Sequence, residues 1–255
     1  MDIELAWNGP AATIVLNRPA KRNAMTLDMW RRVPNLVAEA LARDTTRLLV
    51  LRGNAGAFSA GADIAEFPQA YASAEAATAN QKTIQAAMTS VEQCPLPTLA
   101  AIDGSCYGGG CGLALACDLR FATTGASFAI TPAKLGLVYG VDDTRRLVAA
   151  VGPSRAKDIL FTGRTLPATE ALQMGLVNAI HAPEDLDAAV ARFAQSLGAV
   201  SAHSARATKR ILSKLADGCR QDDDESRSLF AEAFAGPDFR EGFAAFMERR
   251  PPKFS

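Results

Sequence analysis

The pattern of apolar and polar positions at the start of the chain predicts a hairpin followed by an amphipathic helix. Residues 3–7 and 12–17 have the composition of strands, and they flank Asn8-Gly9-Pro10, a typical turn. Thr26 can cap a helix that continues to about residue 43, with its apolar residues on one face. The N-terminal segment therefore contains both a strand pattern and a helix pattern.

Two short, continuous apolar segments, 48–52 and 97–102, are typical of strands that are buried on both faces. The remaining predicted elements are an interrupted helix ending near residue 93, strands at 119–122, 127–130 and 176–180, and helices at 153–161, 167–174, 184–198, 201–217, 222–235 and 238–249. Strands alternate with helices in the first two thirds, and helices alone follow. The sequence thus predicts an α/β core over residues 1–197 and a helical C-terminal region over residues 198–255.

Charge and cysteine content limit the classes of function. Lys+Arg and Asp+Glu number 27 each in 255 residues, which argues against nucleic acid or an anionic membrane as the main partner. No apolar segment approaches the roughly 20 residues that span a bilayer, and the opening residues do not resemble a signal peptide. Five cysteines without a CxxC pair favour reduced, buried thiols in a cytoplasmic protein, and two isolated histidines give no metal site.

The most informative segment is the glycine run Gly108-Gly109-Gly110, which continues through Cys111 to Gly112 and leads into an apolar helical segment. Glycine leaves main-chain N–H donors uncovered, and a glycine turn before a helix can hold negative charge. The run contains no acid, histidine, lysine or serine. It is suited to stabilising an oxyanion, so any proton transfer must come from elsewhere.

A second loop of small residues, 58–64, follows the buried strand at 48–52 and has the same character. If the two apolar strands are parallel neighbours, both loops lie at one edge of the sheet, where α/β sites form. Two N–H donors would then converge on one oxygen. The alternative is that each glycine cluster serves only a tight turn.

Several motifs occur together in a characteristic order. They are Leu16-Asn17-Arg18-Pro19 with Asn23-Ala24-Met25, the stretch 58–64, Asp103-Gly104 with the glycine run, Ala116-Cys117-Asp118, Pro132 to Leu137 with Arg146-Leu147, Phe161-Thr162-Gly163-Arg164, Ala168 to Ala171 with Gly175-Leu176-Val177, and Glu241 to Phe246 with Arg249-Arg250-Pro251. In this order they resemble the crotonase superfamily, also called the enoyl-CoA hydratase/isomerase family, over nearly the whole chain. The resemblance implies a crotonase-like α/β fold: a spiral of ββα units with a C-terminal helical region for trimerisation.

The resemblance also implies an acyl-CoA thioester as substrate, with coenzyme A as part of it and no separate cofactor. Backbone N–H groups of Ala62 and Gly109 would hold the thioester oxyanion. The positions that match coenzyme A contacts are Lys21, Arg22, Ala24, Ala60, Asp63 and Ile64, with Phe246 and Arg249 closing the nucleotide site, often from a neighbouring subunit of a homotrimer or dimer of trimers. Two alternatives stay open: a merely solvated basic loop at Lys21 and Arg22, and a tail helix that packs within its own subunit.

The chain departs from the hydratases of this family at their two glutamates. Gly112 and Pro132 stand at those positions, and neither can transfer a proton. The segment 131–139 is similar to that of the methylmalonyl-CoA decarboxylase branch, which keeps an acid at the Gly112 position; the similarity implies catalytic roles for Thr131 and Tyr139. The alternative for Tyr139 is a packed core aromatic residue.

Four other polar residues receive structural interpretations. Asp143 is predicted to cap a helix through residues 146 and 147, Asp118 to join a helix to a strand, and His203 to lie on a helix surface, while Glu66 is a weak candidate for the acyl pocket. We therefore expect an acyl-CoA enzyme that stabilises an enolate and acts as a decarboxylase or isomerase rather than as a hydratase. The alternative is an inactive acyl-CoA-binding protein.

Overall fold

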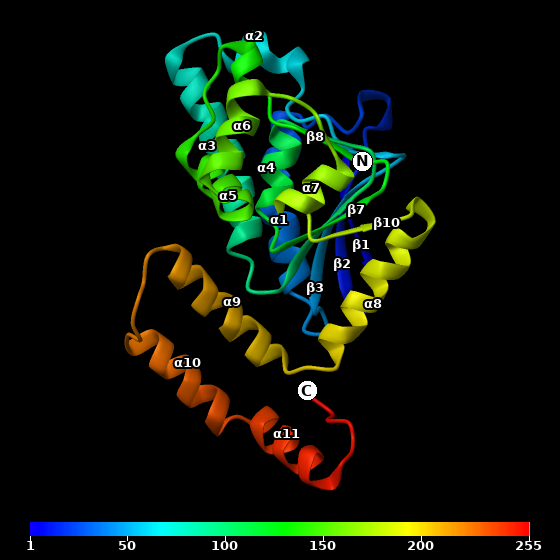
Figure 1. Cartoon of the computed structure of the whole chain (residues 1–255), viewed down its shortest axis with the longest axis vertical. Coiled ribbons are helices and arrows are strands. Elements are labelled where there is room, and N and C mark those ends of the chain that lie inside the picture. The colour runs from blue at the N-terminus through cyan, green and yellow to red at the C-terminus, as the bar shows by residue number, and fades with distance from the viewer. Residues whose placement is uncertain (255) are drawn as a thin grey trace.

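The computed structural model, which describes residues 1–254, contains two β-sheets covered by helices (Figure 1). Within this range the larger sheet has the order β1-β2-β3-β5-β7-β10, with bounds Ile3–Asn8, Ala11–Leu16, Leu48–Gly53, Thr98–Ile102, Leu119–Thr123 and Ala179–His181. The smaller sheet has the order β4-β6-β8-β9, with bounds Ala57–Ser59, Ser105–Tyr107, Ser127–Ala129 and Leu166–Pro167. β1 and β2 form the predicted antiparallel hairpin, and every later pair in the larger sheet is parallel.

Strands β3 and β5 are direct parallel neighbours, with Leu49 opposite Thr98 and Leu51 opposite Ala100. All five residues of β5 and the first four of β3 are buried, as their unbroken apolar sequence predicts. The carboxyl ends of the two strands therefore lie at one edge of the sheet. The loops that follow them, which carry the two glycine clusters, leave the sheet side by side.

Helices cover the sheets and then continue beyond them. Their bounds are α1 Leu27–Leu41, α2 Phe67–Ala70, α3 Ala74–Glu92, α4 Gly109–Leu115, α5 Val141–Val151, α6 Pro153–Thr162, α7 Ala168–Met174, α8 Leu186–Gly198, α9 Ala202–Ala216, α10 Asp224–Ala235 and α11 Pro237–Glu248, with short 3-10 turns η1 Pro19–Lys21, η2 Ile64–Glu66, η3 Pro132–Leu135 and η4 Pro183–Asp185. The Thr26 hydroxyl accepts from the Met29 N–H at 3.3 Å, so the predicted cap of α1 is confirmed. None of the described helices is both long and apolar enough to cross a membrane.

The structure corrects the sequence prediction in several places. Helix α4 begins at Gly109 rather than at Gly112, and α5 spans Val141–Val151, so the helix predicted through residues 146 and 147 begins before Asp143 rather than after it. Strands β4 and β6 lie where loops were expected, because three residues are too few to show a period. The glycine loops are thus anchored by a second sheet.

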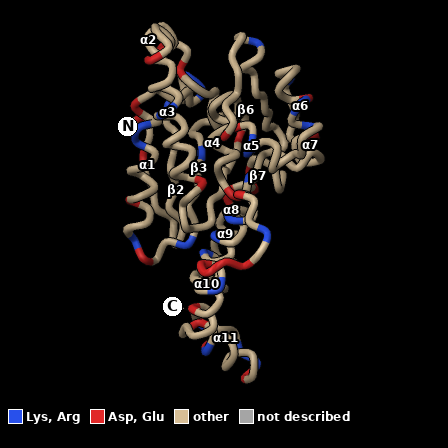
Figure 2. Tube along the Cα trace, turned by 90° about the vertical axis from the view of Figure 1, so that its left-hand side faces the viewer, with Lys and Arg blue, Asp and Glu red and all other residues tan. Residues whose placement is uncertain are grey.

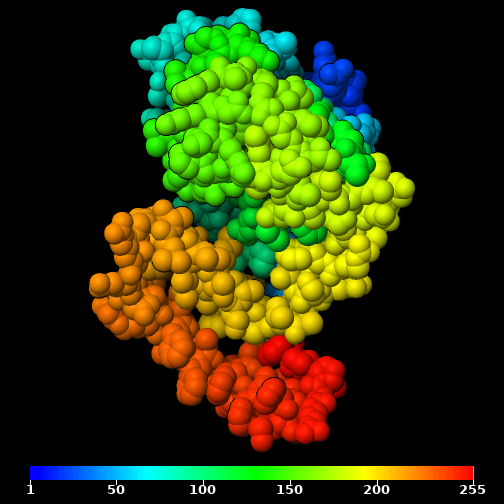
Figure 3. Space-filling model, viewed as in Figure 1, coloured from blue at the N-terminus to red at the C-terminus, as the bar shows by residue number. Residues whose placement is uncertain are grey.

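The C-terminal helices α9, α10 and α11 project from the core as an arm (Figures 1 and 3). The arm is tied to the core by Lys209 of α9, whose ammonium donates to the Leu96 carbonyl at 3.0 Å and to Asp118 at 2.7 Å. Leu96 precedes β5, so the arm lies at the amino ends of the parallel strands, opposite the glycine loops. Acidic and basic residues alternate along the trace without forming one continuous stripe (Figure 2).

Candidate active site

The two glycine loops touch through their backbones. A Cβ atom placed on Gly61 would lie 2.8 Å from the Tyr107 carbonyl oxygen and 3.1 Å from the Gly109 nitrogen, and Gly61 has φ +94°. A Cβ atom on Gly109 would lie 3.6 Å from the Ala62 nitrogen and 3.3 Å from the Trp30 ring. The approach requires glycine at position 61, whereas a Cβ atom on Gly109 would meet the Ala62 nitrogen at an ordinary van der Waals distance. The predicted convergence of the loops is therefore present in the structure.

Two N–H donors are left free where the loops meet. Among residues 1–254 neither the Ala62 N–H nor the Gly109 N–H has an acceptor, whereas the N–H groups of Gly61, Asp63 and Gly108 do. Gly61 donates to the Ser59 hydroxyl at 3.1 Å, Asp63 to the Met25 carbonyl at 2.9 Å, and Gly108 to the Ala129 carbonyl at 2.8 Å. Since these bonds fix the flanking peptides, the two free donors are held in place before any ligand binds. This is the arrangement that an oxyanion hole requires.

Asn23 connects the loop that follows β2 to the loop that contains Ala62. It is fully buried and has φ +55°. Its side-chain amide donates to the carbonyls of Asn54 and Ala57 at 2.9 and 2.7 Å, and its Oδ1 accepts from the Arg18 N–H at 2.8 Å. Asn23 belongs to one of the sequence motifs, but the sequence alone predicts no role for it. The signal that could have found it is an asparagine after a polar turn, since asparagine tolerates a left-handed conformation.

Arg18 and Asp63 also link the loop that follows β2 to the loop that contains Ala62. The Arg18 guanidinium bonds Asp63 at 2.9 Å and the Ala24 carbonyl at 2.6 Å. The hydrogen bond from the Ala65 N–H, followed by that from Arg18, lowers the pKa of Asp63 from its ordinary value of 3.8. The Asp63 carboxylate and the Ala24 carbonyl are thus already bonded within the protein, so their side-chain and carbonyl oxygens serve loop structure.

The other residues predicted to contact coenzyme A are mostly placed together. Lys21 and Arg22 are exposed, the Ala60 N–H donates to the Arg22 carbonyl at 2.8 Å, and Ile64 is 73% exposed. These residues, with Ala24 and Asp63, lie on two loops beside Ala62. Two exposed cations next to the free donors suit an anionic phosphate-bearing ligand.

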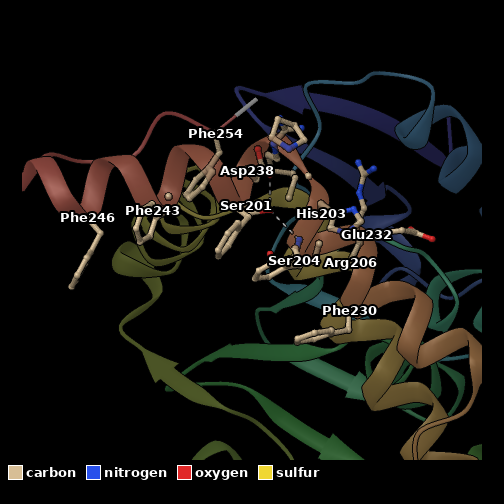
Figure 4. A pocket seen from close by; sticks show the side chains of 18 of the residues that line it. Ser201, His203, Ser204, Arg206, Phe230, Glu232, Asp238, Phe243, Phe246 and Phe254 are labelled. Carbon is tan, nitrogen blue, oxygen red and sulfur yellow. Dashed lines mark hydrogen bonds between the residues drawn. The ribbon is translucent and has the colours of Figure 1, made fainter.

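Phe246 and Arg249 are not brought to this site within one chain. Phe246 lies on α11 and Arg249 directly follows that helix, at the far end of the arm. Phe246 instead lines a cavity of about 1010 Å³ between α9, α10 and α11. Figure 4 shows the rings of Phe230, Phe243 and Phe246 projecting from their helices at this cavity. Within one chain, Phe246 therefore lies too far from the predicted coenzyme A loops to contact a ligand bound there.

The wall next to the free donors is formed by Gly112, Met88 and Tyr139. A Cβ atom on Gly112 would lie 2.6 Å from the Met88 Cε and 3.2 Å from the Tyr139 hydroxyl. That hydroxyl donates to the Gly108 carbonyl at 3.2 Å, and burial raises the pKa of Tyr139, so it stays a neutral donor. Thr131 precedes the turn η3, and its side chain makes no capping bond. Tyr139 is thus next to the donors, whereas Thr131 makes no hydrogen bond to the two loops within the described residues.

The structural interpretations of other polar residues have mixed outcomes. Asp118 joins β5 to β7 by accepting from the Thr98 N–H and hydroxyl at 2.8 and 3.0 Å, so its structural role is confirmed. Glu66 accepts from the Leu27 N–H at 2.7 Å and holds the start of α1. His203 lies exposed on α9, as predicted. The capping role of Asp143 is wrong: α5 begins after Gly140 without a side-chain cap, and Asp143 bonds Gln85 and Arg146 instead.

Comparison with known proteins identifies the family of this fold and site. The family model described as enoyl-CoA hydratase/isomerase matches residues 8–255. The chain belongs to the enoyl-CoA hydratase/isomerase family. It is 34% identical over 251 residues to the crotonyl-CoA hydratase of Syntrophomonas wolfei, covering 95% of this chain and 94% of the relative.

Solved structures of the enoyl-CoA hydratase/isomerase family superpose on the whole chain. An enoyl-CoA hydratase/isomerase family protein from Hyphomonas neptunium has a TM-score of 0.97 at 47% identity, over 100% of this chain and 98% of that one. An enoyl-CoA hydratase/carnithine racemase from Magnetospirillum magneticum has a TM-score of 0.95 at 33% identity, over 100% and 96%. The predicted crotonase-like α/β fold is therefore confirmed.

Proposed function

We propose that this member of the enoyl-CoA hydratase/isomerase family binds acyl-CoA thioesters and stabilises their enolate forms between the N–H groups of Ala62 and Gly109. The observation that supports it is the pair of fixed, unpaired donors on two touching loops. A thioester carbonyl gains negative charge as it becomes an enolate, so such donors bind the transition state more tightly than the ground state. Coenzyme A would extend over the exposed cations Lys21 and Arg22.

The proposed reaction is isomerisation or decarboxylation rather than hydration. Water addition by the two-glutamate route needs acids at positions 112 and 132, where this chain has glycine and proline. Met88 fills the space into which a side chain at position 112 would extend. In the decarboxylation variant, the Tyr139 hydroxyl would hold the substrate carboxylate.

A second candidate is a catalytically inactive acyl-CoA-binding protein, which the absence of both acids favours. One experiment separates the two. The purified protein is offered crotonyl-CoA, a 3-enoyl-CoA and methylmalonyl-CoA, and each product is identified by mass. We expect turnover of the second or third. Rapid hydration of crotonyl-CoA would refute the proposed chemistry, while tight binding of several esters without turnover would favour the binding protein.

Substitution of Gly109 tests the oxyanion hole itself. Gly109→Pro removes one N–H at the first position of α4, where proline is otherwise tolerated. Loss of one such donor costs about 3 kcal/mol of transition-state stabilisation, or roughly a hundredfold in kcat. Gly109→Ala keeps the N–H but adds a Cβ atom 3.6 Å from the Ala62 nitrogen, and Gly125→Ala, at an open surface position, is the matched control. Full activity of Gly109→Pro would contradict the assignment.

We further propose that the protein works in the cytoplasm as a homotrimer or a dimer of trimers. The arm carries large apolar side chains that one chain leaves uncovered: Leu212 59%, Leu215 56%, Phe230 73%, Phe234 61%, Phe243 60%, Phe246 80% and Met247 66% exposed. A neighbouring subunit would cover this surface and bring Phe246 and Arg249 to the coenzyme A loops. Sedimentation equilibrium tests the assembly, and a monomer at micromolar concentration would contradict it. Phe246→Ala should then raise KM for the acyl-CoA.

A further inference from the structure

The Tyr139 hydroxyl bonds the peptide group that carries one of the two proposed donors. It donates to the Gly108 carbonyl at 3.2 Å, and this carbonyl belongs to the same peptide group as the Gly109 N–H. A trans peptide group is planar, and its C=O and N–H point in opposite directions. A bond that fixes the direction of the carbonyl therefore also fixes the direction in which the Gly109 N–H points.

The peptide group between Gly108 and Gly109 depends on such a bond because a glycine lies on each side of it. Gly108 has φ +51° and ψ −119°, a combination that glycine adopts readily and other residues rarely do. Without a Cβ atom on either side, steric hindrance to rotation of the peptide group is small. The Gly108 carbonyl also accepts from the Gly112 N–H at 3.2 Å, in the first turn of α4. Tyr139 thus adds a second restraint, from outside the loop.

The Ala62 donor is held in the same way, but by the backbone alone. Its peptide group includes the Gly61 carbonyl, which accepts from the Met25 N–H at 2.8 Å. The Met25 carbonyl in turn accepts from the Asp63 N–H at 2.9 Å. These bonds require no particular side chain. A substitution of Tyr139 should therefore change the Gly109 donor and leave the Ala62 donor in place.

The hydroxyl reaches the Gly108 carbonyl because position 112 is a glycine. A Cβ atom on Gly112 would lie 3.2 Å from the Tyr139 hydroxyl oxygen, so a side chain there would crowd the hydroxyl. Burial raises the pKa of Tyr139, so the hydroxyl keeps its proton. Because a hydroxyl has one proton, the bond to Gly108 leaves none for simultaneous donation to a substrate carboxylate.

We infer that Tyr139 is a positioning residue of the proposed oxyanion hole, which orients the Gly109 N–H through the Gly108 carbonyl and strengthens it as a donor to the thioester oxygen. This inference rests on the proposed function. A hydrogen bond to a peptide carbonyl polarises the whole peptide group, and linked hydrogen bonds strengthen one another by about 10–30% each. In this role Tyr139 touches no reacting atom, in contrast to the contact with a substrate carboxylate considered above.

Infrared spectroscopy of bound butyryl-CoA, labelled with carbon-13 at the thioester carbonyl, tests this role. Donors at the carbonyl oxygen lower its stretching frequency relative to the free ester. Tyr139→Phe keeps the ring and removes the hydroxyl, so this lowering should shrink by at least about 10–30%. A 3-fluorotyrosine at position 139 is a stronger donor and should increase the lowering. Tyr71→Phe, which removes the hydroxyl of a 42% exposed tyrosine at the end of α2, is the matched control and should give the wild-type frequency.

Kinetics separate this role from a direct contact with the substrate. With the substrate that the wild type converts, Tyr139→Phe should lower kcat about 2- to 10-fold, the effect of one hydrogen bond, and leave KM nearly unchanged. If Tyr139 instead held a substrate carboxylate, Tyr139→Phe would raise KM for methylmalonyl-CoA and leave the carbonyl frequency of butyryl-CoA at its wild-type value. That pair of results would overturn the inference.

The infrared measurement also keeps the two proposals apart. Failure of the wild type to bind butyryl-CoA, or binding that does not lower the carbonyl frequency, would overturn the proposed function. A lowered frequency that stays the same in Tyr139→Phe and with 3-fluorotyrosine would overturn only the role of Tyr139. If Tyr139→Phe does not fold, the 3-fluorotyrosine protein decides, because it keeps the hydroxyl and a purely structural role predicts an unchanged frequency.

Discussion

Replacement of Asn23 should show how strongly the loops around the proposed oxyanion hole depend on one buried amide. Asn23→Ala removes three side-chain hydrogen bonds, those with Asn54, Ala57 and the Arg18 N–H. At about 0.5–1.5 kcal/mol each, their loss costs about 2–4 kcal/mol. Alanine is also strained at φ +55°, which adds about 1 kcal/mol relative to asparagine. The expected loss of about 3–5 kcal/mol is a large part of the stability of a typical domain.

Urea unfolding measures this loss, and two further variants separate its causes. Asn23→Gly removes the same side-chain bonds without left-handed strain, so it should be more stable than Asn23→Ala by up to about 1 kcal/mol. Asn8→Ala, at an exposed position in the hairpin, should stay within about 0.5 kcal/mol of the wild type. A loss below about 1 kcal/mol for Asn23→Ala, at unchanged m value, would refute the reasoning.

Three further predictions concern other contacts. Gly112→Ala should destabilise the fold by about 1–3 kcal/mol because its Cβ overlaps Met88, and a double-mutant cycle with Met88→Ala should recover part of that cost; additive losses would argue against the contact. Folding lowers the pKa of Asp63, so its ionised form stabilises the fold above pH 3.8, and this contribution is lost as the pH falls through the lower folded value. The unfolding free energies of the wild type and Asp63→Asn should therefore converge below pH 3.8. A difference that stays constant with pH would exclude the effect. Lys209→Met should weaken the attachment of the arm to Asp118 by under about 1 kcal/mol and speed chymotryptic cleavage of α10 and α11; an unchanged cleavage rate would show that the contact does not hold the arm.

The convergence of the two glycine loops could be predicted from the sequence because it depends on local backbone features. Gly61 and Gly109 can be read directly from the sequence as part of two glycine clusters. The unbroken apolar strands before these clusters indicate a parallel sheet with both loops at one edge. No distant side chain is needed to form these two donors. The same reasoning explains why the hairpin and the cap at Thr26 were predicted correctly.

The side-chain wall of the site could not be predicted in the same way, because its members are distant in the sequence. Met88 and Gln85 come from α3, which shows weak amphipathic periodicity, and they meet residues more than 20 positions later. Asp143 illustrates the resulting error. Its position near a helix start suggested a local cap, but a partner on another helix determined its actual bonds. The arm was predicted as helical, yet the direction in which it leaves the core depends on the tertiary contact made by Lys209.

The packing around Gly112 and the hydrogen bonding of the two loops differ in what they indicate about whether the protein is catalytically active. The filling of the space beside Gly112 by Met88 is explained by stability alone, because a cavity would cost about 24 cal/mol per Å³ in any folded protein. Stability does not explain why the Ala62 N–H stays unpaired beside the Gly109 N–H while the N–H groups of Gly61, Asp63 and Gly108 are bonded. The two convergent donors fit a ligand oxygen that gains negative charge during reaction, as proposed above for an acyl-CoA thioester.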